Sequence, residues 1–154
     1  MGVVVRLHYF QILTASLEFC AEQKGLQVYA YVIMPNHFHL ICSQVNGKLS
    51  AVIGDMKQYT SGEIARKLEE DGRLTWLSAM RGAAGKSGAV KVWDEGCHPE
   101  QVHSRPFFNQ KADYIHNNPV RAGFVADPCA WKYSSAAAYY GYGQSVVPLA
   151  GMEF

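Results

Sequence analysis

A chain of 154 residues is long enough for one domain with a substantial core. Nearly half of the residues are hydrophobic and 18% are charged, which excludes a disordered chain, and a formal net charge of +1 excludes a strong overall attraction to nucleic acid. A polyanion would therefore have to bind a local patch. The four cysteines form no Cys-x-x-Cys pair, which argues against a zinc ribbon or a disulfide framework and suits a reducing cytoplasm. No apolar run approaches membrane-spanning length.

The first part of the sequence predicts a helix followed by a β-hairpin. Residues 1–7 are apolar and β-branched and favour a short strand. From residue 8, apolar residues recur every three or four positions, as on one face of a helix. Residues 26–34 are rich in Val, Tyr and Ile and predict a central strand. Pro35 and Asn36 then indicate a turn into a second strand over residues 37–43.

The middle of the sequence predicts three helices. Apolar spacing predicts an amphipathic helix over residues 49–59. Thr60, with Glu63 three residues later, has the form of a capping box and predicts that a second helix begins at residue 61 and runs to residue 70. Residues 73–81 favour a third, shorter helix.

The remainder predicts a loop, an edge strand and two more helices. Residues 82–89 are small and glycine-rich, which is typical of a loop, and residues 90–93 favour a short edge strand. Ser104 is a good N-cap for a helix that we expect to end just before Pro119. Residues 134–140 favour one more short helix.

His37 and His39 are the first candidate functional residues. Alternate residues of a strand point to the same face, so the two imidazoles would lie side by side while Phe38 and Leu40 face the core. Two neighbouring imidazoles can share one divalent metal ion. The alternative is a pair of histidines on a partly solvated strand with no ligand, and the sequence around them does not decide between the two.

The helix before Pro119 carries a second set of polar side chains. Lys111, Tyr114 and Asn118 follow one another at helical spacing and share one face. Asn118 could supply a third ligand to a metal bound by the histidine pair, and Mg²⁺ or Mn²⁺ would suit such a set. Tyr114 would then hang over the metal. The alternative is an ordinary solvated face on a helix that ends at an asparagine before proline.

Five segments of the sequence resemble a single family. They occur in the family's order, and the resemblance covers residues 8–142. The segments are residues 31–41 (YVIMPNHFHLI), 56–61 (MKQYTS), 92–96 (VWDEG), 114–125 (YIHNNPVRAGFV) and 131–135 (WKYSS). The family is that of the single-tyrosine HUH transposases, in its insertion-sequence-200-like and REP-associated branch.

The resemblance implies an α+β domain with a ferredoxin-like central antiparallel sheet, which bears the histidine strand and has helices packed on it. One such domain would span residues 1–154. The implied activity is metal-dependent cutting and rejoining of single-stranded DNA through a 5′-phosphotyrosine. His37 and His39 match the family's metal-binding pair, Asn118 matches the third ligand, and Tyr114 matches the nucleophile.

The N-terminus departs from the family pattern. Relatives usually begin with a sheet strand before the first helix, whereas only residues 1–7 precede it here. We therefore expect that the N-terminal strand is missing or replaced. This would leave an open sheet edge that a second copy could cover, which predicts a homodimer.

Single-stranded or hairpin DNA is the expected partner. The candidate phosphate-binding residues are Lys57, Lys111, Arg121 and Lys132, although each alone is also typical of a solvated face. Two other functions stay open. One is a domesticated or inactive relative that binds DNA hairpins without transposing them, and the other is a metal-dependent hydrolytic nuclease in which water replaces the tyrosine.

Overall fold

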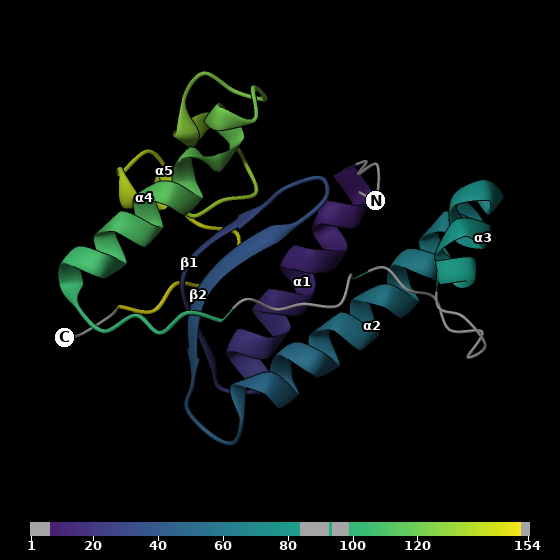
Figure 1. Cartoon of the computed structure of the whole chain (residues 1–154), viewed down its shortest axis with the longest axis horizontal. Coiled ribbons are helices and arrows are strands. Elements are labelled where there is room, and N and C mark those ends of the chain that lie inside the picture. Colours follow the sequence, from purple (N-terminus) through teal and green to yellow (C-terminus); the bar gives the residue numbers. More distant parts are fainter. Residues whose placement is uncertain (1–6, 84–92, 94–98, 152–154) are drawn as a thin grey trace.

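Helices pack on both faces of a β-hairpin (Figure 1). The computed structural model describes residues 7–83, 93 and 99–151. In chain order the elements are α1 (Leu7–Gln23), β1 (Leu26–Ile33), β2 (Phe38–Gln44), α2 (Leu49–Glu70), α3 (Leu74–Ala83), α4 (Arg105–Arg121), the short 3₁₀ helix η2 (Pro128–Ala130) and α5 (Ala136–Tyr139). The predicted α+β class is confirmed. The strands predicted over residues 1–7 and 90–93 and the loop over residues 82–89 fall largely outside the described residues.

The predicted hairpin forms, and its register places the histidines. β1 and β2 pair antiparallel, with Ile33 opposite Phe38 and Val32 opposite His39. The N–H of Met34 donates to the carbonyl of His37 over 2.8 Å, which closes the turn at Pro35 and Asn36. His37 therefore lies at the mouth of the hairpin, one residue before β2 begins.

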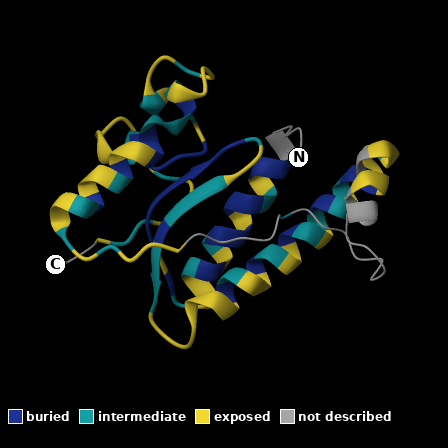
Figure 2. Ribbon diagram, in the orientation of Figure 1, coloured by how far each residue is buried: buried dark blue, intermediate teal, exposed yellow. Residues whose placement is uncertain are grey.

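The strands alternate between two apolar layers. On one face Val28, Tyr31 and Ile33 pack with residues of α1 and α2. On the other face Ala30, Val32 and Met34 pack with residues of α4. β1 is consequently buried along almost its whole length, as its dark blue colour in Figure 2 shows. In β2, Phe38 and Leu40 pack against the α1 side, so His39 between them faces α4.

The C-terminal segment covers the edge of β1 that faces away from β2. The N–H of Ile33 donates to the carbonyl of Tyr133 over 2.8 Å, and the N–H of Ser135 donates to the carbonyl of Tyr31 over 3.0 Å. Further along, Ala150 donates to the carbonyl of Val28 over 2.8 Å. Within the described residues the sheet has two strands and one isolated bridge, and β1 takes the central place predicted for it.

The prediction of two helices over residues 49–70 was wrong, because α2 is one continuous helix. The Thr60 hydroxyl donates to the Met56 carbonyl over 2.8 Å, one turn back, and so does not cap a new helix. It also accepts a hydrogen bond from Nε1 of Trp93 over 3.0 Å. The buried residues of α2 recur every four positions through this point, namely Val52, Met56, Thr60, Ile64 and Leu68.

The predicted end of α4 was also wrong. The helix continues through Pro119 to Arg121, and a Schellman turn ends it. Gly123 has a φ of +81°, and its N–H donates to the carbonyl of Val120 over 3.0 Å. The N–H of Phe124 donates to the carbonyl of Pro119 over 2.9 Å. Proline therefore removes one helical hydrogen bond but does not set the boundary, which the left-handed glycine sets.

The remaining helices form close to where the sequence predicts them. α1 ends before Gly25, which has a φ of +75°, and α5 forms within its predicted range. The predicted end of α3 at residue 81 was wrong, because the helix continues to Ala83 and so takes the first two residues of the predicted loop. None of the helices described has both the length and the apolar character needed to cross a bilayer. The described cysteines, Cys20, Cys42 and Cys129, form no disulfide with one another.

Candidate metal and tyrosine site

The hairpin presents two imidazoles side by side. His37 is exposed and His39 is half-buried, and their ring centroids lie 5.1 Å apart with an interplanar angle of 85°. Nδ1 of His37 lies 2.6 Å from Oδ1 of Asn36. An amide oxygen can only accept, so Nδ1 carries the hydrogen and Nε2 keeps its lone pair for a ligand.

Helix α4 supplies the second half of the site. Ser104 caps its N-terminus by accepting from the N–H of Phe107 over 3.3 Å, and Pro106 occupies the first turn. Phe108, Ala112 and Ile115 are buried against the sheet. This contact fixes the rotation of the helix, so the polar face that includes Tyr114 and Asn118 points toward the mouth of the hairpin.

The two halves meet as expected from the sequence. Nδ2 of Asn118 lies 3.4 Å from Nε2 of His37, although the two residues are 81 positions apart. The ring of Tyr114 lies edge-on to that of His39, with 5.9 Å between centroids. Tyr114 is 53% exposed, so a large partner can reach its phenol. The structure thus brings all four predicted residues to one place.

Partial desolvation lowers the pKa of both histidines, which favours their neutral form. It lowers the pKa of His37 below the ordinary 6.5. Desolvation also lowers the pKa of His39, and repulsion from a protonated His37, from Arg121 and from Lys111 lowers it further. Neutral imidazole is the form that ligates metals, so no proton has to leave before a metal binds.

The donor set fits a divalent cation. Within the described residues, no three His, Cys, Asp or Glu side chains could hold a metal ion together. Among the described residues, a third ligand to a metal bound by His37 and His39 would therefore be of another type, and the amide of Asn118 is in place for it. Its Nδ2 faces His37, so ligation requires the amide to turn and present Oδ1, an exchange of two atoms of similar size. Imidazole with an amide oxygen suits Mn²⁺ well and Mg²⁺ acceptably.

The predicted phosphate-binding residues lie at different distances from this centre. Lys111 and Arg121 are close enough to His39 to affect its pKa. Nζ of Lys111 also pairs with Glu100 over 2.6 Å. Lys132 lies over the ring of Tyr133 at 5.7 Å, and Lys57 is half-buried on α2.

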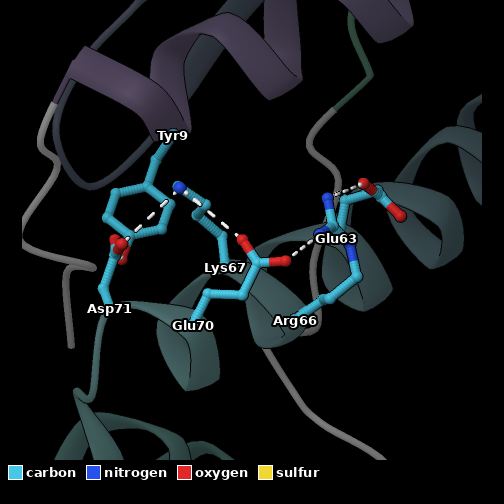
Figure 3. Close-up of polar contacts among 6 residues, drawn as sticks. All are labelled: Tyr9, Glu63, Arg66, Lys67, Glu70 and Asp71. Carbon is cyan, nitrogen blue, oxygen red and sulfur yellow. Dashed lines mark hydrogen bonds and ion pairs between the residues drawn. The ribbon is translucent and has the colours of Figure 1, made fainter.

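Two other cations of α2 are already paired with carboxylates. Figure 3 shows Arg66 and Lys67 turned toward acidic residues of the same helix. Arg66 pairs with Glu63 over 3.0 Å and also with Glu70. Lys67 lies 3.6 Å from Glu70 and 3.5 Å from Asp71. These pairs neutralise much of the positive charge that α2 could offer to a phosphate.

A groove of about 730 Å³ between α1 and α2 lies apart from the site, because none of the predicted site residues lines it. Phe19 and Tyr59 are on its walls. Tyr59, the last residue of the helix predicted over residues 49–59, is 61% exposed, whereas Tyr29 and Tyr31 of β1 are buried.

Sequence reasoning missed Asn36 as a member of the site. It was interpreted as half of a turn signal, although its side chain holds the ring of His37. The available signal was its place directly before a histidine, where an Asn side chain can reach the neighbouring imidazole. His116 of α4 lies outside this site: it is 1% exposed, and its Nε2 lies 2.7 Å from Oγ of Ser135.

Comparison with known proteins agrees with this geometry. A family model described as IS200-like transposase matches residues 5–80, which include both histidines and end before α4. Over these residues the chain is similar to the IS200-like transposase family. A solved structure of a REP-associated tyrosine transposase bound to a REP hairpin shares the fold, with a TM-score of 0.61, 16% sequence identity, and coverage of 96% of this chain and 78% of that one. No curated protein sequence matches the chain.

Proposed function

We propose that this chain is a DNA strand transferase that cuts and rejoins single-stranded DNA through a covalent bond to Tyr114. The observation that carries the proposal is the meeting of Tyr114 and Asn118 of α4 with His37 and His39 of the hairpin. The match of residues 5–80 to the IS200-like transposase model supports a transposase activity. The solved relative was bound to a REP hairpin, which supports hairpin DNA as the substrate class.

In this reaction the phenol of Tyr114 is the nucleophile. It loses its proton to solvent, and its oxygen forms a bond to the scissile phosphorus. The bond between phosphorus and the 3′ oxygen breaks, and the 3′ oxygen takes up a proton. The product is a 5′-phosphotyrosine and a free 3′-hydroxyl, which allows a strand end to reverse the step and be joined.

His37, His39 and Asn118 are the residues that would hold a divalent metal, Mg²⁺ or Mn²⁺. A bound metal would neutralise charge on a non-bridging phosphate oxygen as it develops in the transition state. Asn36 keeps Nε2 of His37 free for this role. The positive side chains of Lys111 and Arg121 beside His39 favour a phosphate at the same place.

Contacts farther along the strand are assigned to Lys57 and Lys132, which would bind phosphates outside the reacting centre. The homodimer and the cytoplasmic location expected from the sequence stay predictions.

Incubation of the protein with single-stranded hairpin DNA and Mn²⁺ tests the proposal. We expect a covalent protein–DNA adduct on a denaturing gel, with the modified peptide mapped by mass spectrometry to Tyr114. Tyr114→Phe removes one oxygen from an exposed ring and should abolish the adduct while hairpin binding persists. Tyr142→Phe is the matched control, because Tyr142 is 80% exposed and belongs to no part of the site.

Two results would contradict the proposal and indicate the other functions. Tight hairpin binding without cleavage would indicate a DNA-hairpin-binding protein. Cleavage without an adduct, retained in Tyr114→Phe, would indicate a hydrolytic nuclease that uses water.

A further inference from the structure

The side chain of Arg121 makes two contacts with Tyr114, one with its ring and one with its main chain. Its guanidinium carbon lies 4.0 Å from the centroid of the Tyr114 ring, so the planar group covers one face of the phenol. Its Nη2 donates to the main-chain carbonyl of Tyr114 over 2.7 Å. The two residues are seven positions apart on α4, which is about two helical turns and therefore the same face.

The position of Arg121 follows from how α4 ends. Pro119 lies between the two residues and has no N–H, so the helix lacks the hydrogen bond that the carbonyl of Ile115 would accept. The helix nevertheless continues to Arg121, because the turn at Gly123 closes it two residues later. The hydrogen bond from the Arg121 guanidinium to the carbonyl of Tyr114 links the last turn of α4 to the turn that carries Tyr114.

The hydrophobic core does not fix the orientation of the Tyr114 side chain, so another contact has to fix it. The side chain is 53% exposed and meets His39 edge-on at 5.9 Å between ring centroids. An exposed tyrosine can leave one χ1 rotamer for another, whereas an in-line attack requires its oxygen within about 3–3.5 Å of the phosphorus. A planar cation over one ring face restricts the ring and leaves its hydroxyl edge free.

We propose that Arg121 is a positioning residue that holds the Tyr114 phenol in the orientation for attack. This rests on the proposed function, in which Tyr114 is the nucleophile. This role differs from the expectation from the sequence, which was that the charge of Arg121 binds a DNA phosphate. Substitution by lysine separates the two roles, because lysine keeps the charge and loses the planar group that stacks and donates in a fixed fork.

The first test measures the ring itself and needs no catalysis. Protein labelled with 3-fluorotyrosine is examined by ¹⁹F NMR, and the Tyr114 resonance is assigned as the one lost in Tyr114→Phe. In Arg121→Lys this resonance should move toward that of the exposed Tyr142 and become narrower. Arg66→Lys is the matched control, because Arg66 pairs with carboxylates of α2 instead of an aromatic ring, and it should leave the Tyr114 resonance unchanged. A Tyr114 resonance that does not move in Arg121→Lys overturns the proposal.

The second test separates positioning from DNA binding. Single-turnover adduct formation is measured with saturating hairpin DNA and Mn²⁺, and the Kd for the hairpin is measured separately. Loss of a cation–π contact at an exposed site predicts that Arg121→Lys forms the adduct about fivefold more slowly, with a Kd within about twofold of the wild type. An unchanged rate at saturation with a weaker Kd would make Arg121 a phosphate contact and overturn the proposal. If wild-type protein forms no adduct, the proposed function fails, and the NMR result alone decides the placing of the ring.

Discussion

His37 can be removed at little cost to the fold. The ring of His37 is exposed and contacts Asn36, Asn118 and His39, all outside the apolar layers. Surface substitutions usually change the free energy of unfolding by less than about 0.5 kcal/mol, and we expect His37→Ala to fall in that range. Ile33 is 1% exposed on the neighbouring strand, so Ile33→Ala should cost about 2–5 kcal/mol. At about 2–4 °C per kcal/mol for a chain of this size, the Tm falls by about 4–20 °C in Ile33→Ala and by no more than about 2 °C in His37→Ala.

Thermal unfolding followed by circular dichroism, with and without Mn²⁺, measures both effects. Metal at about 100 times its Kd should stabilise the wild type by about 2.7 kcal/mol, which raises the Tm by about 5–11 °C. His37→Ala should lose most of this rise and all adduct formation while keeping its metal-free Tm. The reasoning is refuted if His37→Ala melts as low as Ile33→Ala, or if Mn²⁺ still raises its Tm as much as that of the wild type.

Three other substitutions test single contacts. Asn36→Ala should weaken Mn²⁺ binding by about 10- to 100-fold in calorimetry, because Nδ1 of His37 then loses the acceptor that fixes its tautomer, and equal affinity in both proteins would count against this. Burial lowers the pKa of His116 from the ordinary 6.5 to about 4, so the unfolded chain binds more protons between these values and the free energy of unfolding falls as the pH falls through this range. In urea unfolding at several pH values, His116→Gln should show a shallower fall than the wild type, and parallel curves would contradict the assignment. Thr60→Val leaves Nε1 of Trp93 without its acceptor and should lower the free energy of unfolding by about 1–3 kcal/mol, whereas a loss below about 0.5 kcal/mol would show that the contact is not needed.

Local patterns predicted most of the secondary structure, and they failed where one pattern has two physical meanings. Thr60 followed by Glu63 has the form of a capping box, but a threonine hydroxyl can equally bond to the carbonyl one turn back inside a helix. The burial of Ile64 and Leu68 continues the apolar stripe of α2 and therefore favours one continuous helix over a new helix at Thr60. Pro119 in turn forbids one hydrogen bond only, so its presence could not locate the end of α4.

The candidate site was predictable in part. Strand alternation alone places His37 and His39 on one face, and helical spacing alone places Tyr114 with Asn118. That the two pairs meet depends on the packing of α4 on the sheet. The residues alone left this open, and the family resemblance favoured it. The partner of each positively charged side chain could not be predicted from the sequence. The sequence does not show that Arg66 pairs with carboxylates, or that Arg121 lies over an aromatic ring.

Because the C-terminal segment covers one edge of β1, removing that segment exposes unpaired backbone groups of the strand. A fragment ending at residue 80 would keep the histidine hairpin and the whole segment matched by the family model. It would also strip the backbone groups of Val28, Tyr31 and Ile33 of the partners that the last part of the chain supplies. An open edge on an apolar strand recruits strands from other molecules, so such a fragment should aggregate instead of folding into a smaller metal-binding unit. Truncating mutations far from the histidines should therefore first appear as insoluble protein.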